Sequence, residues 1–248
     1  MEVKSIVKGS AALFFPADCK ICRMPLEPLN RSFICENCWN KVEWLKEPYC
    51  SKCSKPFPSS NPSQGISLPL CRECQENPPY FKRLFAPTLY ERVIKKAIHL
   101  LKYNGKKGVL RGIERVMKIY FNNAGSLPFL SLDLIIPVPL HKKRLKQRGF
   151  NQAELLTLII AKYFHLKLGK DNLERVKPTR SQTTLNRKER AENMRGAFRL
   201  KNGEELRGKS ILLVDDVYTT GTTVKEVSKT VIKAEPKEIY VFVLARAT

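Results

Sequence analysis

The chain has 248 residues, and its 45 lysines and arginines outnumber 23 aspartates and glutamates to give a formal net charge of +22. With 43% hydrophobic and 27% charged residues it can bury a core, which excludes collagen-like, mucin-like and wholly disordered proteins. We find no stretch that approaches the roughly 18 uninterrupted apolar residues of a membrane-spanning helix. The apolar run at 11–16 is shorter than the about 7–15 apolar residues of a secretory signal. We therefore expect a soluble, cytoplasmic protein without membrane insertion.

All eight cysteines lie in the first third of the sequence, in four C-x-x-C pairs: Cys19, Cys22, Cys35, Cys38, Cys50, Cys53, Cys71 and Cys74. Two such pairs can supply the four thiolates of a tetrahedral zinc site, so the pattern predicts two structural Zn²⁺ sites. Sequential pairing is the simplest arrangement, and an interleaved one stays open. Disulfides and iron–sulfur clusters are weaker alternatives, because we see no export signal and the spacers are polar and proline-rich. With little apolar area to bury, residues 17–76 should unfold without zinc.

The positive charge is concentrated in the remainder of the chain. Residues 1–80 carry 10 basic and 8 acidic residues, whereas residues 81–248 carry 35 and 15. Two stretches hold much of this excess: residues 141–150 contain five basic residues and no acid, and residues 175–199 contain eight against two acids. A solvated face is the commoner explanation for any single basic run. Two runs together favour an anionic ligand, either the phosphates of a small molecule or a nucleic-acid backbone.

The hydrophobic pattern after residue 80 predicts alternating helices and strands. In chain order we expect two helices, a strand, a helix, a strand, a helix and a strand, over residues 89–102, 110–121, 132–138, 151–164, 210–214, 223–232 and 238–245. Lys102 should lie on the outer side of the first helix, and Asn151 should cap the third. Residues 176–195 are polar and basic and should form a mobile loop. The alternation predicts an α/β fold with a parallel sheet covered by helices on both faces.

The segment ILLVDDVYTTGTT, residues 211–223, is the most informative part of the sequence. A buried strand delivers Asp215 and Asp216 to its C-terminal end, which is where ligands bind in open α/β sheets. The loop and helix start that follow offer backbone N–H groups and hydroxyls to a phosphate, with Gly221 allowing a close approach of the main chain. Two carboxylates repel phosphate but can accept hydrogen bonds from vicinal ribose hydroxyls. The segment therefore predicts a site for a ribose 5-phosphate, with a simple helix-capping turn as the alternative.

The same segment resembles the signature of type I phosphoribosyltransferases, which bind 5-phosphoribosyl-1-diphosphate (PRPP). Four features together resemble the ComF family of competence proteins: the cysteine pairs, the ribose-phosphate loop, IPVPLHKKRLKQRGFNQAELL at 136–156 and RSQTTLNRKERAENMRGAF at 180–198. The resemblance covers nearly the whole chain. It implies a double zinc ribbon over residues 1–78, beside a type I phosphoribosyltransferase-like parallel sheet flanked by helices over residues 79–248.

The resemblance also implies roles for residues around the ribose. Asp215 and Asp216 would hold the 2′- and 3′-hydroxyls. The 5′-phosphate would be surrounded by the loop residues Thr219, Thr220, Gly221, Thr222 and Thr223.

Charged residues would surround the reacting end of the ligand. Arg144 and Arg148 would lie beside the diphosphate, and Mg²⁺ would bridge its oxygens. Residues 180–195 resemble a loop that closes over the ribose, with Arg187 and Arg190 as catalytic charge partners.

Membership of this family would imply handling of incoming single-stranded DNA in natural transformation, together with proteins of the DNA-uptake machinery. The alternative is an active pentosyltransferase that moves ribose 5-phosphate to a small acceptor in nucleotide metabolism. At the first loop position, purine-base transferases usually carry an acidic residue, and here it is Thr219. This difference argues against a purine as the substrate, and the sequence does not decide whether the chain is an active enzyme. A third hypothesis is a scaffold that grips a protein partner through residues 17–76. The aromatic residues that could stack on bases are predicted to pack in the interior instead: Trp39, Trp44, Phe81, Phe85 and Tyr90.

Overall fold

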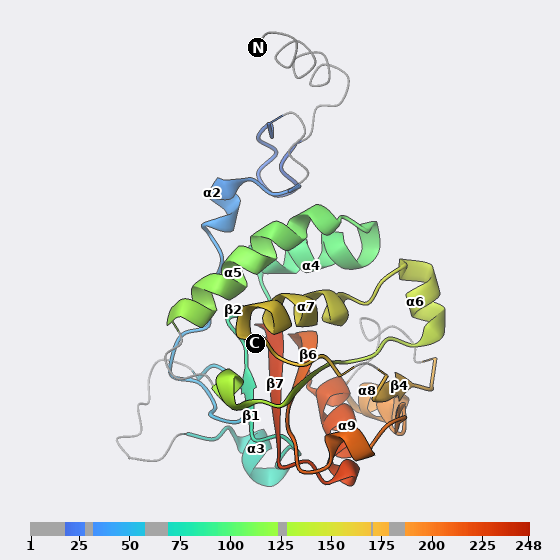
Figure 1. The fold of residues 1–248 in the computed structure, drawn as a ribbon. Helices are drawn as coiled ribbons and strands as arrows, with labels where there is room; N and C mark the ends of the chain where they lie inside the picture. The colour runs from blue at the N-terminus through green and yellow to red at the C-terminus, as the bar shows by residue number, and fades with distance from the viewer. Residues whose placement is uncertain (1–17, 28–31, 58–68, 124–127, 170, 179–186) are drawn as a thin grey trace.

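The computed structural model describes residues 18–27, 32–57, 69–123, 128–169, 171–178 and 187–248 (Figure 1). These residues form a parallel sheet in the order β1-β7-β6-β3, and β2 also pairs with β7. The strands are β1 Arg83–Phe85, β2 Thr88–Leu89, β3 Leu134–Pro137, β6 Ser210–Tyr218 and β7 Glu238–Arg246. The predicted mixed α/β fold with a mostly parallel sheet and flanking helices is confirmed.

Both faces of the sheet are buried, which explains why its central strands are continuously apolar. Along β6, Leu212 and Val214 pack into the core on one face, whereas Ile211 and Leu213 pack into the core on the other. Successive side chains of a strand point to opposite faces of the sheet. Because both faces are buried, an apolar residue is needed at every position of the strand. The strand is longer than predicted and continues through both aspartates to Tyr218.

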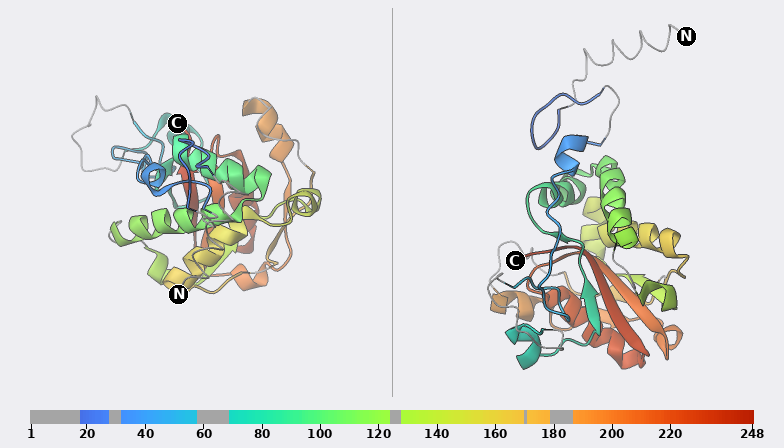
Figure 2. Two further views of the ribbon diagram at one scale, coloured as in Figure 1. Left: turned by 90° about the horizontal axis from the view of Figure 1, so that it is seen from above. Right: turned by 90° about the vertical axis from the view of Figure 1, so that its left-hand side faces the viewer.

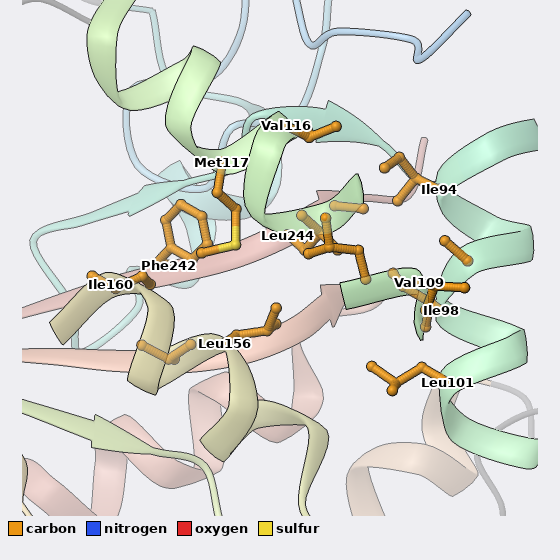
Figure 3. Packing of buried hydrophobic residues seen from close by; sticks show 14 of the residues in the cluster. Ile94, Ile98, Leu101, Val109, Val116, Met117, Leu156, Ile160, Phe242 and Leu244 are labelled. Atoms are coloured by element: carbon orange, nitrogen blue, oxygen red, sulfur yellow. The ribbon is translucent and has the colours of Figure 1, made fainter. Parts of the chain in front are cut away.

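Helices α4, α5 and α7 cover one face, and α9 covers the other (Figures 1 and 2). Figure 3 shows the first of these cores, where Ile98 of α4, Met117 of α5 and Leu156 of α7 meet Phe242 and Leu244 of β7. The main helices are α4 Arg92–Asn104, α5 Leu110–Asn123, α7 Gln152–Phe164 and α9 Thr222–Val231. Short 3-10 turns occupy Lys107–Val109, Pro128–Ser131, Glu204–Leu206 and Ile232–Ala234.

Local capping sets the ends of the helices around the sheet. Asn151 caps α7 as predicted, its side chain accepting a hydrogen bond from the backbone N–H of Ala153 at 3.1 Å. A short helix that was not predicted, α6 Lys142–Arg148, is capped by the His141 side chain and ends at Gly149 in the left-handed conformation. Most of the basic run at 141–150 therefore lies on one exposed helix.

The prediction of a mobile loop over residues 176–195 is wrong for its last part. Residues Arg187–Met194 form helix α8, and β5 Phe198–Leu200 then pairs antiparallel with β4 Leu173–Arg175. Met194 is fully buried and anchors the end of this polar helix in the core that α9 also contacts. The remainder of the predicted loop, residues 179–186, lies outside the described residues.

The cysteine pairs lie on opposite sides of the sheet. The knuckles of Cys19–Cys38, with the short helix α2 Glu36–Trp39, join the core of α4, α5 and α7. The knuckles of Cys50–Cys74, with α3 Arg72–Glu76, join the core of α9. Figure 1 shows α2 above α5 and α3 at the opposite end of the molecule. Among the described residues, every helix is too short or too polar to cross a membrane.

Candidate functional site

The loop between β6 and α9 has the tight backbone geometry expected of an anion site. Gly221 has a φ of +75°, and a Cβ atom at this position would stand 2.1 Å from the Tyr218 hydroxyl oxygen. Only glycine fits this combination of a left-handed backbone and close approach. The hydroxyls of Thr220 and Thr222 are hydrogen-bonded at 2.8 Å, and α9 begins at Thr222 with its N-terminus at the loop. Backbone N–H groups and the helix dipole at this point favour a phosphate.

The two aspartates lie directly before this loop and are almost fully buried, with 8% of Asp215 and 5% of Asp216 exposed. The backbone N–H of Asp216 donates to the Asp215 carboxylate at 2.9 Å. Burial raises the pKa of Asp215 to about 7, and the negative charge of Asp216 adds to that rise. A pair of buried carboxylates with its oxygens near a cavity is suited to accepting hydrogen bonds from a diol.

Lys102 completes this pair, although the sequence placed it on the outer side of its helix. Its ammonium group, from the last turn of α4, forms an ion pair with the Asp216 carboxylate, and only 20% of its side chain is exposed. Burial alone would lower the pKa of Lys102, but the neighbouring charges of Asp216 and Asp215 raise it above its ordinary value. The expectation of an outward-facing Lys102 is therefore wrong, since the last turn of α4 extends over the carboxyl end of β6.

A cavity of about 190 Å³ brings these groups together with the predicted diphosphate residues. Arg144 and Arg148, both from α6, line the same cavity as the two aspartates. Burial lowers the pKa of Arg148, whereas the charge of Asp216 opposes that shift. The residues that line the cavity are Tyr90, Lys102, Tyr103, Val138, Pro139, Leu140, Arg144, Arg148, Gln152, Arg175, Asp215, Asp216, Val217, Thr219 and Thr223.

Arg175 is a buried guanidinium in this cavity that sequence reasoning missed. It is only 7% exposed, stands 5.6 Å from the Phe198 ring and donates to the Met194 sulfur at 3.2 Å. Burial lowers its pKa to about 10, and the nearby charge of Arg144 acts in the same direction. In the sequence Arg175 was one of eight basic residues in a polar stretch, with no signal that set it apart. Among the residues that the structure describes, four basic and two acidic side chains line the cavity, a balance that suits a diol carrying several phosphate charges.

The two predicted catalytic arginines lie on α8, near its start. Arg187 is the first residue of that helix and Arg190 follows one turn later. Their side chains are outside the part of the chain that the structure describes, so their proposed role stays a prediction.

The eight cysteines form two tetrads, and the structure groups the knuckles sequentially. Cys19, Cys22, Cys35 and Cys38 bring their sulfurs together, as do Cys50, Cys53, Cys71 and Cys74, all within 4.8 Å of one another in each tetrad. The sulfur separations include 3.6 Å for Cys22–Cys35, 3.8 Å for Cys19–Cys38 and 3.7 Å for Cys53–Cys71. A zinc–sulfur bond of about 2.3 Å places tetrahedral ligands about 3.8 Å apart. All eight thiols are unbridged, so both tetrads fit structural zinc.

Hydrogen bonds from Arg246, at the end of β7, link the backbone of the second cysteine ribbon to the phosphate loop. The Arg246 guanidinium donates to the backbone carbonyls of Cys53 at 3.1 Å, Tyr218 at 3.2 Å and Thr219 at 3.0 Å. It also lies over the Tyr218 ring, 4.7 Å from its centroid. A second link comes from Lys225 of α9, which forms an ion pair with Glu73 between two zinc-ligating cysteines. The second cysteine ribbon is therefore part of the wall behind the phosphate loop.

A larger cavity of about 520 Å³ lies away from the carboxylates, between the first cysteine ribbon and α5. Trp39 and Trp44 line it together with Gly112 and Tyr120, and it carries none of the charged residues of the smaller cavity. Trp39, Phe81 and Phe85 are buried, as predicted. Tyr90 is half-buried and lines the carboxylate cavity instead.

The fold and site define a chain that joins a double zinc ribbon to a phosphoribosyltransferase-type sheet. Residues 10–75 match the double zinc ribbon domain, and residues 155–248 match the phosphoribosyl transferase domain. The chain is 31% identical over 235 residues to the DNA utilization protein YhgH of Escherichia coli O6:H1, covering 94% of this chain and 99% of that one. It is 30% identical over 236 residues to competence protein F of Haemophilus influenzae, again covering 94% and 99%. Competence protein ComFC of Bacillus subtilis is 24% identical over 224 residues, covering 86% of this chain and 84% of ComFC.

The chain belongs to the ComF family, which contains these competence and DNA utilization proteins.

Proposed function

We propose that the protein binds PRPP with Mg²⁺ in the carboxylate cavity and handles single-stranded DNA during DNA uptake in the cytoplasm. The observation that carries the proposal is the cavity itself, where two buried carboxylates, Thr219 and Thr223 of the phosphate loop and four basic side chains converge. Asp215 and Asp216 accept hydrogen bonds from the ribose hydroxyls. Residues 219–223 surround the 5′-phosphate.

The basic side chains act on the diphosphate end of the ligand. Arg144 and Arg148 bind its oxygens, joined by Arg175 from β4. When bound, Mg²⁺ would supply charge neutralisation at this end of the ligand, since magnesium takes few protein ligands when phosphates are present. Lys102, which pairs with Asp216 and lines the same cavity, adds a further positive charge beside the ligand. These assignments make PRPP binding dependent on both carboxylates.

Support for the DNA part of the proposal comes from two further observations. Relatives that align over nearly the full chain carry the names DNA utilization protein and competence protein. Residues 81–248 hold 35 basic against 15 acidic residues, and α6 carries five of those basic residues, of which Lys142, Lys143 and Lys146 are exposed. We propose residues 1–78 and 79–248 as the two domains, and proteins of the DNA-uptake machinery as partners.

Isothermal titration of the zinc-loaded chain with PRPP and Mg²⁺ tests the pocket. Asp216→Asn should weaken PRPP binding by about 10- to 100-fold, because a charge-assisted hydrogen bond to the diol contributes about 1.5–3 kcal/mol. Asp171→Asn, at an exposed aspartate whose side chain is 87% accessible, is the matched control and should leave affinity unchanged. Equal binding by Asp216→Asn and wild type would refute the ribose assignment.

A second function, an active transferase, is favoured by the same pocket together with α8, which carries Arg187 and Arg190 near the hairpin of β4 and β5. In that case the ribose C1 loses diphosphate and gains an acceptor, while the protein positions the reactants and stabilises charge. A screen that measures diphosphate release with nucleobase and amine acceptors distinguishes the two functions. Release that depends on acceptor and is lost in Arg187→Ala or Arg190→Ala supports the transferase, whereas binding without release supports a sensor of PRPP.

A further inference from the structure

A line of aromatic and basic side chains runs from the first zinc ribbon to the carboxylate cavity. The Lys106 ammonium lies over the Phe33 ring at 5.0 Å, and the Lys107 ammonium lies over the Phe150 ring at 5.0 Å. The Arg148 guanidinium lies 5.8 Å from the Tyr103 ring. We call these six residues the track: Phe33, Tyr103, Lys106, Lys107, Arg148 and Phe150.

The track joins three parts of the chain that are distant in sequence. Phe33 belongs to the first ribbon, between its two cysteine knuckles, whereas Tyr103 and the two lysines lie at the end of α4 and in the turn that follows. Arg148 and Phe150 come from the end of α6 and the residues after it. Tyr103 and Arg148 also line the carboxylate cavity, so one end of the track is the mouth of that cavity. Figure 1 shows α6 beside the end of α4, with the first ribbon above.

Phe33 and Phe150 are half-buried and pack against the core of α4, α5 and α7, whereas Tyr103 projects from the surface. Tyr103 is 59% exposed, and its ring stacks 4.8 Å from that of His99, which is also exposed. Lys106 and Lys107 are exposed as well. Neither residues 103–108 nor residues 141–150 contain an aspartate or glutamate. The surface therefore combines partly exposed aromatic rings with a local excess of basic residues.

We propose that the track binds single-stranded nucleic acid, with bases stacking on the rings and phosphates on the neighbouring ammonium and guanidinium groups. This assignment rests on the proposed handling of single-stranded DNA and names the surface that does it. Single strands fit better than duplexes, because only unstacked bases can lie on aromatic rings. An acidic protein would use the charges but leave the rings without a partner.

The chemistry of the cavity keeps the DNA strand on the track. Asp215 and Asp216 are buried acceptors that suit a vicinal diol, and a DNA strand has no 2′-hydroxyl to offer them. The two carboxylates also repel a phosphodiester that approaches closely. PRPP and DNA therefore bind side by side, meeting at Tyr103 and Arg148.

Fluorescence anisotropy with a labelled oligo-dT tests the track in the full, zinc-loaded chain. Lys106→Gln with Lys107→Gln should weaken binding about tenfold and reduce the salt slope by about 1.4, because each phosphate contact on a single strand contributes about 0.7. Tyr103→Ser should weaken binding about 5- to 100-fold at an unchanged salt slope, since stacking is not electrostatic.

Matched controls remove the same groups from other surfaces. Lys229→Gln with Lys233→Gln deletes two exposed lysines, one in the last turn of α9 and one in the 3-10 turn that follows, and Tyr80→Ser deletes a tyrosine that is 50% exposed beside the second ribbon. Each control should change DNA affinity by less than about twofold. If the controls lost as much affinity for oligo-dT as the track variants, the proposed binding surface would be refuted, and DNA binding would be a diffuse attraction to positive charge. Wild-type protein that binds PRPP but no oligo-dT at low salt would instead refute the proposed DNA function. The double lysine variant should bind PRPP normally.

Discussion

The two zinc ribbons use the same ligands but are embedded very differently. In the second ribbon all four cysteines are at most 5% exposed, whereas in the first Cys22 is exposed and Cys35 half-buried. Ser54 of the second ribbon donates to the Leu84 carbonyl at 2.7 Å, which ties the ribbon to strand β1. The second ribbon is therefore buried against the sheet and hydrogen-bonded to it.

The first ribbon contacts the remainder of the protein through a few buried residues and an exposed ion pair. Trp39 of α2 packs on Gly112 of α5, and Arg115 of α5 bonds to Glu36 and to Asn40, the latter at 2.9 Å. The Arg115–Glu36 pair is exposed, and exposed pairs contribute only about 0–1 kcal/mol. The difference teaches that one metal chemistry can serve two tasks. In our proposal the second ribbon supports the phosphate loop, and the first contributes Phe33 to the track.

Removing one zinc site at a time should give the largest effects and separate these tasks. Cys53→Ser with Cys74→Ser should abolish PRPP binding and lower the melting temperature strongly, because structural zinc contributes about 10–16 kcal/mol and a domain has only about 5–15 kcal/mol of stability. Cys22→Ser with Cys35→Ser should weaken oligo-dT binding and leave PRPP affinity unchanged.

Zinc content by mass spectrometry should fall from two ions to one per chain in both double variants. Calorimetric titration then gives PRPP affinity and anisotropy gives DNA affinity. Retained PRPP binding after loss of the second zinc, or its disappearance after loss of the first, would contradict the division of tasks.

Sequence alone predicted the parts whose information is local. The C-x-x-C spacing identifies all eight sulfurs of the tetrads, and the apolar runs identify the long strands β6 and β7. The cap at Asn151 was predicted for the same reason, since a capping side chain bonds within three residues of itself. Patterns of this kind depend on neighbours along the chain.

The residues that sequence missed act across long separations. Lys102 follows the polar side of an amphipathic helix, and only the position of α4 over β6 turns it toward Asp216. Arg246 ends an apolar strand and meets the carbonyl of Cys53, 193 positions earlier in the chain. Arg175 lies on a strand of only three residues, too short to show a period. Such contacts are set by tertiary packing, which no local pattern records.

Replacing either of two glycines with alanine should give intermediate effects and sharpen the comparison between the two ribbons. A Cβ at Gly112 would stand 2.0 Å from the Trp39 ring, so Gly112→Ala should reverse the usual gain of about 1 kcal/mol for alanine in a helix and destabilise by about 1–3 kcal/mol. It should loosen the first ribbon and weaken DNA binding only. Gly221→Ala should weaken PRPP binding at least about tenfold, because Tyr218 blocks the new methyl group.

The control for these variants is Gly208→Ala. Gly208 has a φ of +65° with nothing within 4 Å of the added Cβ, so it reports the backbone cost of about 1–2 kcal/mol without a clash. Thermal unfolding and the two binding assays measure all three variants. A Gly221→Ala protein that binds PRPP as tightly as Gly208→Ala would show that the loop tolerates the methyl group.

Substituting Arg246 tests the link between the second zinc site and the phosphate loop most directly. Arg246→Met keeps much of the apolar stem but leaves the carbonyls of Cys53, Tyr218 and Thr219 without this donor. We expect about 2 kcal/mol of destabilisation and about tenfold weaker PRPP binding, with unchanged DNA binding. Arg246→Lys should be intermediate, because an ammonium lacks the planar fork that reaches several carbonyls. Arg199→Met, which removes an exposed partner of Glu174, is the matched control and should cost less than about 1 kcal/mol.

The rate of zinc release shows whether PRPP binding also stabilises the second zinc site, as the zinc site is expected to support PRPP binding. Linkage requires that a ligand which stabilises the loop also stabilises the zinc site bonded to it. In wild type, PRPP should slow the chelator-driven loss of one zinc per chain and leave the other unaffected. In Arg246→Met that protection should diminish, because the guanidinium no longer joins the Cys53 carbonyl to the Thr219 carbonyl. Equal protection of both ions by PRPP, or full protection in Arg246→Met, would mean that the two ribbons differ in burial but not in their connection to the ligand.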